Sequence, residues 1–300
     1  MTSTVPEPGG PRVVAIGGGH GLSNALRAIR GYAGEITAIV TVADDGGSSG
    51  RLRRDLGILP PGDLRKALVS LSDESGVWSR AFEHRFDDGE LAGHALGNLV
   101  LAALFETTGD PVRALDEAGR LVGACGRALP ATTEPVVLKA DVDGREVEGQ
   151  VAVATAPGRI RRVEVVPADA PPVPDALAAI AAADQIVLAP GSLYTSVIAV
   201  LAVEGYAGAL RAAPGTVVQV GNLRHQVAET AGLDAADHLA AVLDHGGRVD
   251  VFLAAEPGML AVDADRIGRL GATLAPADVA DAGAAEHDPD RLAIALAALL

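Results

Sequence analysis

Two adjacent carboxylates, Asp44 and Asp45, are the residues of this sequence best placed to do chemistry. They follow the apolar run 36–43 and open the stretch Asp-Asp-Gly-Gly-Ser-Ser-Gly-Arg. Ligands of open α/β sheets bind beyond the carboxyl ends of the strands. Paired carboxylates are costly there unless something compensates them, and an Mg²⁺ ion that bridges to diphosphate oxygens would do so. The alternative is that Asp44 caps the loop while Asp45 lies in solvent.

A glycine-rich loop precedes this pair and suggests a phosphate site. Its residues are Gly17, Gly18, Gly19, His20 and Gly21, and they join a β-rich run at 13–16 to a helical pattern at 22–29. Glycine lets the backbone approach a ligand, and the start of a helix offers N–H donors and a partial positive charge. The loop matches neither GxGxxG nor GxxxxGK[ST]. A tight turn without a ligand is the alternative.

Two further polar loops follow predicted strands. Gly191, Ser192 and Thr195 come after the apolar run 185–189 and form a candidate second phosphate cradle, although Ser192 could instead be an ordinary helix cap. Asn222 follows the predicted strand 216–220. Because the ends of parallel strands meet at one edge of a sheet, these loops should share a crevice with the first two.

A fourth loop, 93–98, precedes the apolar helix predicted over 96–106. Its Asn98 could read the edge of a base or a sugar, whereas His94 could equally be a core histidine.

The elements that must position these loops alternate between short apolar runs and helical stretches. This alternation predicts an α/β fold with a mostly parallel sheet. The pattern changes at 136–166, where an Asp-Gly turn between 136–142 and 147–154 predicts a β-hairpin, and 161–166 adds a strand. Asp63 is expected to cap the helix that carries Leu64 and Leu68. We expect residues 1–11 to be a disordered tail and 12–300 to form a single domain, with a β-rich insertion around 127–166.

Composition excludes several classes of protein. The chain has 300 residues, is 49% hydrophobic and carries a formal net charge of −15, which argues against electrostatic binding of nucleic acid. The single cysteine, Cys125, cannot form an internal disulfide. No secretory signal and no membrane-spanning run is visible, so a cytoplasmic location is expected. A homodimer stays open.

At these loops the sequence resembles a known family. GGGHGLSNALR, ITAIVTVADDGGSSGRLRRDLGILPPGDLRKAL, GHALGNLVLAAL and APGSLYTSV are similar to the YvcK-like gluconeogenesis factor family. That family belongs to the 2-phospho-L-lactate transferase (CofD-like) superfamily. The resemblance covers nearly the whole chain from residue 13.

The resemblance implies a Rossmann-like three-layer αβα sandwich with a nucleotide site. The site would be lined by Gly17, Gly18, Gly19, His20, Gly21, Asp44, Asp45, Asn98, Gly191, Ser192, Thr195 and Asn222. The YvcK-like branch is associated with UDP-sugar binding and with control of the cell wall and cell shape during gluconeogenic growth. The transferase branch moves a phospholactyl group from a guanosine-diphosphate carrier to a deazaflavin precursor and uses Mg²⁺.

Three hypotheses follow. The first is a regulatory protein that binds a nucleotide-diphosphate sugar with little or no turnover. The second is an Mg²⁺-dependent transferase that uses a nucleotide-diphosphate-linked donor. The third is a dinucleotide oxidoreductase, which the missing GxGxxG spacing disfavours. The chain departs from the family at His20, where threonine is usual, and after Asn222, where the usual Thr and Pro-Gly are missing but Gln226, Glu229 and Thr230 persist.

Overall fold

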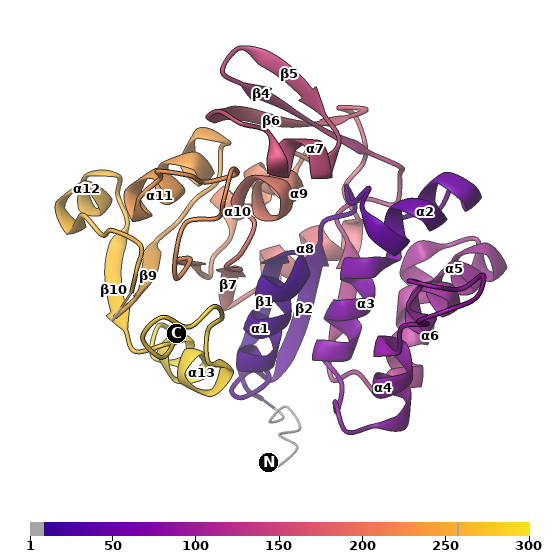
Figure 1. The fold of residues 1–300 in the computed structure, drawn as a ribbon. Helices are drawn as coiled ribbons and strands as arrows, with labels where there is room; N and C mark the ends of the chain where they lie inside the picture. Colours follow the sequence, from indigo (N-terminus) through magenta and orange to yellow (C-terminus); the bar gives the residue numbers. More distant parts are fainter. Residues whose placement is uncertain (1–8, 257) are drawn as a thin grey trace.

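The computed structural model describes residues 9–256 and 258–300 and shows a seven-stranded parallel sheet between two layers of helices (Figure 1). The order of the strands is β10-β9-β8-β7-β1-β2-β3. They are β1 (Arg12–Gly17), β2 (Glu35–Val40), β3 (Arg127–Pro130), β7 (Gln185–Leu188), β8 (Thr216–Val220), β9 (Val251–Ala255) and β10 (Thr273–Ala277). The predicted α/β class, with a mostly parallel sheet, is confirmed.

Helices that follow the strands on the β2 side cover one face of the sheet. They are α1 (Gly19–Ile29), α2 (Gly47–Leu56), α3 (Pro61–Ser70), α4 (Val77–Glu83), α5 (Leu96–Thr108) and α6 (Pro111–Val122). The closing helix α13 (Pro289–Ala297) packs against α1 on the same face. Asp63 lies in the first turn of α3, and Pro60 occupies the cap position, so the prediction that Asp63 caps this helix is wrong.

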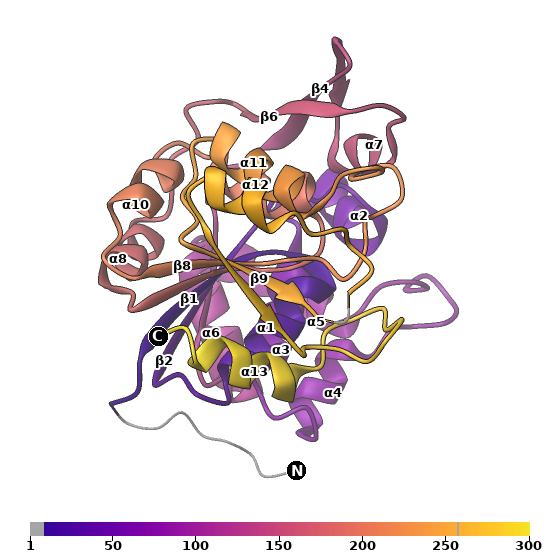
Figure 2. The ribbon, with the colours of Figure 1, turned by 90° about the vertical axis from the view of Figure 1, so that its left-hand side faces the viewer.

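The helices of the other half cover the opposite face, where α8 and α10 pack together (Figure 2). They are α8 (Pro174–Ala182), the π-helical turn η1 (Leu193–Ile198), α9 (Ala199–Leu201), α10 (Tyr206–Ala212), α11 (Ala235–Asp244) and α12 (Ala264–Arg269). The chain thus extends the sheet in one direction after β1 and in the other direction after β7. The crevice beyond the ends of β1 and β7 is therefore a topological switch point, where ligands of open α/β sheets bind.

A small antiparallel sheet, in the order β5-β4-β6, sits over this carboxyl edge. It contains β4 (Val137–Val142), β5 (Arg145–Glu148) and β6 (Ile160–Val166), and the short helix α7 (Gln150–Thr155) follows β5. The predicted hairpin turn is present, with Asp143 and Gly144 at positive φ. The prediction of a strand through 147–154 is wrong beyond Glu148, because α7 begins at Gln150. Residues 127–130 belong to the main sheet rather than to the small one.

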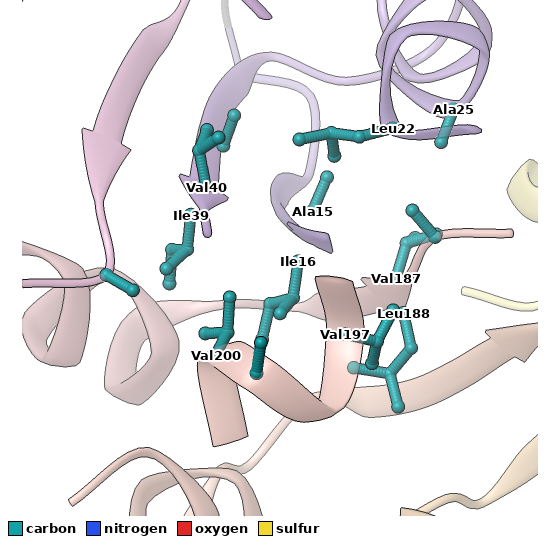
Figure 3. Packing of buried hydrophobic residues seen from close by; sticks show 14 of the residues in the cluster. Ala15, Ile16, Leu22, Ala25, Ile39, Val40, Val187, Leu188, Val197 and Val200 are labelled. Carbon is teal, nitrogen blue, oxygen red and sulfur yellow. The ribbon is translucent and has the colours of Figure 1, made fainter. Parts of the chain in front are cut away.

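The core is built from small aliphatic side chains. Ile16, Ile39 and Leu188 from three neighbouring strands are fully buried, and Val197 and Val200 pack over them (Figure 3). Such side chains allow helices to pack closely on both faces of a parallel sheet, where strands are continuously apolar. Within residues 9–256 and 258–300, no single helix is both long and apolar enough to cross a membrane; by length and composition only the bent pair 193–201 and 206–212 would pass together.

Candidate functional site

A cavity of about 810 Å³ opens at the switch point. Segments far apart in the sequence form its wall: 18–21 with Asn24, Asp44, Asp63 with Lys66, Gln150, 190–192 with Ser196, 222–227, Met259 and 285–287. The loops after β1, β2, β7 and β8 all contribute. The sequence predicted that these loops share a crevice, and the structure brings them together.

The start of α1 forms the floor of this cavity, in close contact with the loop after β7. A Cβ atom on Gly21 would lie 1.8 Å from the carbonyl oxygen of Pro190, and one on Gly18 would lie 2.7 Å from Oδ2 of Asp63. Only glycine fits at Gly21, where the obstacle is backbone, whereas a Cβ on Gly18 would require the side chains of Asp63 and Thr41 to shift. Within the described residues, no side chain caps the N-terminus of α1. Its first N–H groups therefore provide donors for an anion at the cavity floor.

Asp44 and Asp63 form a pair of carboxylates on the same wall. Burial raises the pKa of Asp44, and the nearby charge of Asp63 raises it further. Oδ1 of Asp44 accepts the backbone N–H of Gly46 at 2.9 Å. Lys66 lies 3.4 Å from Asp63 and offsets part of the negative charge. The raised pKa of Asp44 means that a cation at this wall would relieve electrostatic strain.

The donor set at this wall fits Mg²⁺ and does not form a complete protein cage. In residues 9–256 and 258–300 there is no cluster of three or more His, Cys, Asp or Glu side chains that could hold a metal. Mg²⁺ is usually bound through one or two carboxylates together with phosphate oxygens and water. Asp44 and Asp63 are a pair of this kind.

Asp45, predicted as the second metal ligand, is not among the residues that line the cavity. Its Oδ1 accepts the backbone N–H of Val151 in α7, at 3.0 Å. The two neighbouring carboxylates therefore serve different parts of the molecule.

The predicted site residues in the loop after β7 also differ in position: some line the cavity and one does not. Gly191 and Ser192 line the cavity, and Ser192 makes no side-chain capping bond to the helical turn that follows. Thr195 is fully buried and donates, with Tyr194, to the carboxylate of Glu229. Burial raises the pKa of Glu229. The N–H groups predicted as a second phosphate cradle are thus already occupied by a carboxylate of the protein itself.

Asn222 lines the cavity and ties two of its loops together. Its Oδ1 accepts the N–H of Gly191 at 2.5 Å, and its Nδ2 donates to the carbonyl of Gly191 at 2.8 Å. Beyond it, residues 223–227 continue along the wall and bring Arg224 and His225 to the cavity. Arg224 adds a positive charge to the residues that line the cavity.

Asn98 is buried behind the site rather than in it. It accepts from Nε of Arg65 at 3.0 Å and donates to Oγ of Ser48 at 3.1 Å, while Nδ1 of His94 lies 2.9 Å from the same Ser48 oxygen. This network joins α2, α3 and α5 and supports the loop that carries Asp44. Gly17, the last residue of β1, likewise lies outside the set that lines the cavity.

Several residues of the cavity were not among the predicted site residues: Asp63, Lys66, Gln150, Glu286 and His287. Burial lowers the pKa of His287 to about 4, and its Nε2 lies 3.1 Å from the carbonyl of Gly221, so the ring is neutral at pH 7 and donates there. Asp63 follows Pro-Pro-Gly at the start of α3, and Lys66 lies on the same helix. The spacing of these two residues is the signal by which the sequence could have indicated them as site residues. Nothing local marks Gln150 or His287.

Comparison with known proteins places this geometry in context. The family described as 2-phospho-L-lactate transferase CofD matches residues 13–279 of the chain. The gluconeogenesis factor of Halalkalibacterium halodurans is 45% identical over 78% of this chain and 74% of its own length. The gluconeogenesis factor of Bacillus subtilis is 44% identical over 79% of this chain and 75% of its own.

Longer matches and solved structures agree. A relative from Mycobacterium leprae is 45% identical over 97% of this chain and 86% of its own. A crystal structure of a UPF0052 family protein from Bacillus halodurans superposes with a TM-score of 0.92 at 38% identity, and the match covers 97% of this chain and 100% of that one. The fold is therefore shared along the whole length of that protein.

Proposed function

Since the chain belongs to the 2-phospho-L-lactate transferase CofD family and has gluconeogenesis factors among its relatives, we propose that its cavity binds a nucleoside-diphosphate sugar, with a UDP-sugar as the preferred class. In this proposal the protein is a regulator of the gluconeogenesis factor type. Its ligand-bound state links carbon supply to cell-wall synthesis and cell shape.

One observation carries the proposal: the uncapped start of α1, the pair Asp44 and Asp63, and the cation Arg224 face one cavity of about 810 Å³. This volume is in the range of clefts that hold drug-sized ligands, roughly 300–1,000 Å³. Main-chain N–H groups at a helix start suit a diphosphate, and Arg224 adds a charge-assisted donor. The lining at 285–287 and Met259 belongs to the same cavity and is available to the rest of the nucleotide sugar.

An Mg²⁺ ion belongs to the same proposal. Asp44 and Asp63 would hold it, and the ion would neutralise the diphosphate when bound. Lys66 keeps part of the carboxylate charge balanced, and Gly18 leaves space for Asp63 beside the helix start. The residues themselves bind and orient the ligand, and Asn222 ties the loop after β8 to Gly191 in the loop after β7.

Isothermal titration calorimetry with UDP-N-acetylglucosamine, with and without Mg²⁺, tests this function. We expect saturable binding that strengthens with Mg²⁺, and weaker binding in Arg224→Ala. Arg269→Ala is the matched control, because Arg269 is an exposed arginine on α12 that is not in the set that lines the cavity. Absence of heat at millimolar UDP-sugar, together with no change in melting temperature, would contradict the proposal.

A transferase is the second candidate, because the matching family is described as a 2-phospho-L-lactate transferase and because the carboxylate pair suits Mg²⁺ chemistry. The purified protein should be incubated with a guanosine-diphosphate-linked phospholactate, a deazaflavin acceptor and Mg²⁺, and the product followed by mass spectrometry. Turnover that Asp44→Asn abolishes would favour the transferase. Binding of UDP-sugar without turnover favours the regulator.

A further inference from the structure

Asp45 connects the main domain to the small sheet. Its Oδ1 accepts the backbone N–H of Val151 at 3.0 Å, a contact between residues 106 positions apart in the sequence. Val151 lies in the first turn of α7, where N–H groups have no partner within the helix. The carboxylate therefore satisfies a donor that the helix leaves free.

The neighbouring glycines show how closely these two segments approach. Gly149 has φ +100°, and a Cβ atom there would lie 2.6 Å from Oδ2 of Asp45. A Cβ on Gly46 would lie 3.0 Å from Cγ2 of Val151. One oxygen of Asp45 thus bonds to α7 and the other faces the turn before it, so the whole carboxylate is directed at the small sheet.

Helix α7 in turn contributes to the ligand cavity. Gln150, the residue between Gly149 and Val151, lines the cavity with Asp44 and Asp63. α7 also contacts η1, whose Ser196 lines the same cavity. A shift of α7 would therefore move Gln150 relative to the carboxylate pair.

We infer that Asp45 is a positioning residue: it fixes α7 so that Gln150 completes the wall of the cavity, while Asp44 serves the ligand and its cation. This rests on the proposed function only for its effect on ligand binding. The effect on α7 follows from the contact alone. Asp44 and Asp45 thus have two different roles, although their adjacency in the sequence suggests a single shared one.

The chemistry of the two roles differs in a way that one substitution can separate. Asparagine keeps a carbonyl oxygen that accepts the N–H of Val151, but it lacks the negative charge that a carboxylate contributes to Mg²⁺ binding. Asp45→Asn should therefore preserve the positioning of α7, whereas Asp45→Ala should lose it. Asp45 is partly exposed on a loop, so both variants should fold.

Hydrogen exchange of the ligand-free protein, followed by mass spectrometry, is the first test. We expect exchange in 149–155 to rise about 3- to 10-fold in Asp45→Ala, the range that corresponds to loss of one hydrogen bond, and to stay near wild type in Asp45→Asn. Glu148→Ala is the matched control, because Glu148 is an exposed carboxylate on β5 next to α7 whose ion pair, within residues 9–256 and 258–300, is with Lys139. Unchanged exchange in Asp45→Ala would overturn the inference.

Calorimetry with UDP-N-acetylglucosamine and Mg²⁺ is the second test. We expect Asp45→Ala to weaken binding about 3- to 10-fold, whereas Asp45→Asn should bind as wild type does. In a protein that already carries Gln150→Ala, adding Asp45→Ala should cause no further loss of affinity. If Asp45→Asn loses Mg²⁺ dependence as fully as Asp44→Asn does, Asp45 is a metal ligand and the inference fails. If wild-type protein binds no UDP-sugar, the proposed function fails while the exchange result still decides the role of Asp45 toward α7.

Discussion

The backbone N–H and the side-chain hydroxyl of Thr195 both donate to the same carboxylate oxygen of Glu229, at 2.9 and 3.2 Å. Both residues are buried, and Tyr194 gives a third donor to that oxygen. Glu229 ends the stretch 222–229 that brings Arg224 and His225 to the cavity. The contact therefore anchors one wall of the cavity to the start of η1.

Glu229→Ala should destabilise the protein by about 1–3 kcal/mol, because it leaves buried donors without a partner. Urea denaturation followed by circular dichroism measures this change. Glu117→Ala is the control, since Glu117 forms a surface ion pair with Arg120, and its loss should change stability by less than about 1 kcal/mol. Equal effects of the two substitutions would contradict the anchoring role.

The raised pKa of Asp44 gives stability a definite dependence on pH. A carboxyl group whose pKa is higher in the folded state holds its proton more tightly there, so its contribution is fully present below the unfolded pKa of about 3.9 and is lost as pH rises through the folded pKa. Asp44→Asn should remove this loss and raise the melting temperature at pH 7 relative to wild type. Thermal melts of both proteins from pH 4 to pH 8, in buffers free of divalent ions, measure it. A lower melting temperature of the variant across that range would contradict the assignment.

Gly21→Ala should destabilise the protein by about 1–3 kcal/mol, since its Cβ would lie 1.8 Å from a backbone oxygen of Pro190 and the backbone must move. UDP-sugar binding should weaken as well, because the two glycine loops separate. The control is Gly268→Ala in α12, where nothing lies within 4 Å of the added Cβ; we expect no loss of stability there. Chemical denaturation and calorimetry on the same samples check both effects.

Asn98→Ala should destabilise the protein by about 1–3 kcal/mol, because it removes a buried partner of the Arg65 guanidinium and of Ser48. Ligand affinity should fall by a smaller factor, through the loop that carries Asp44. Chemical denaturation and calorimetric titration of the same preparation measure the loss of stability and the loss of affinity separately. Loss of affinity at unchanged stability would instead identify Asn98 as a direct ligand contact.

The sequence predicted the frame of the site better than the direction of its side chains. The glycine turns at 18–21 and 191–192 are tied to strand ends, and parallel strands end at one edge, so their convergence follows from local pattern. Asp45, Thr195 and Asn98 were expected at the ligand by type and spacing. In the structure their polar atoms bond to Val151, Glu229 and Arg65, partners remote in sequence that no local rule identifies.

The same reasoning explains the residues that the sequence did not reveal. Gln150 reaches the cavity because β5 is short and α7 follows it, whereas the valines at 147, 151 and 153 suggested a continuing strand. His287 comes from a connection before α13, a region without glycine-rich loops. The positions of Gln150 and His287 depend on how whole segments pack together, and the hydrophobic periodicity of the sequence does not predict that packing.

The C-terminal segment that carries Glu286 and His287 has a consequence for the order of assembly. Asn24 on α1 donates to the Glu286 carboxylate at 3.2 Å and to the His287 carbonyl at 3.4 Å, so the first helix is bonded to one of the last segments made. On the ribosome, the segments that form the other walls of the cavity are translated long before the segment that carries Glu286 and His287. A growing chain therefore lacks the wall at 285–287 until synthesis has passed residue 287, so the cavity cannot be complete before that segment has been made.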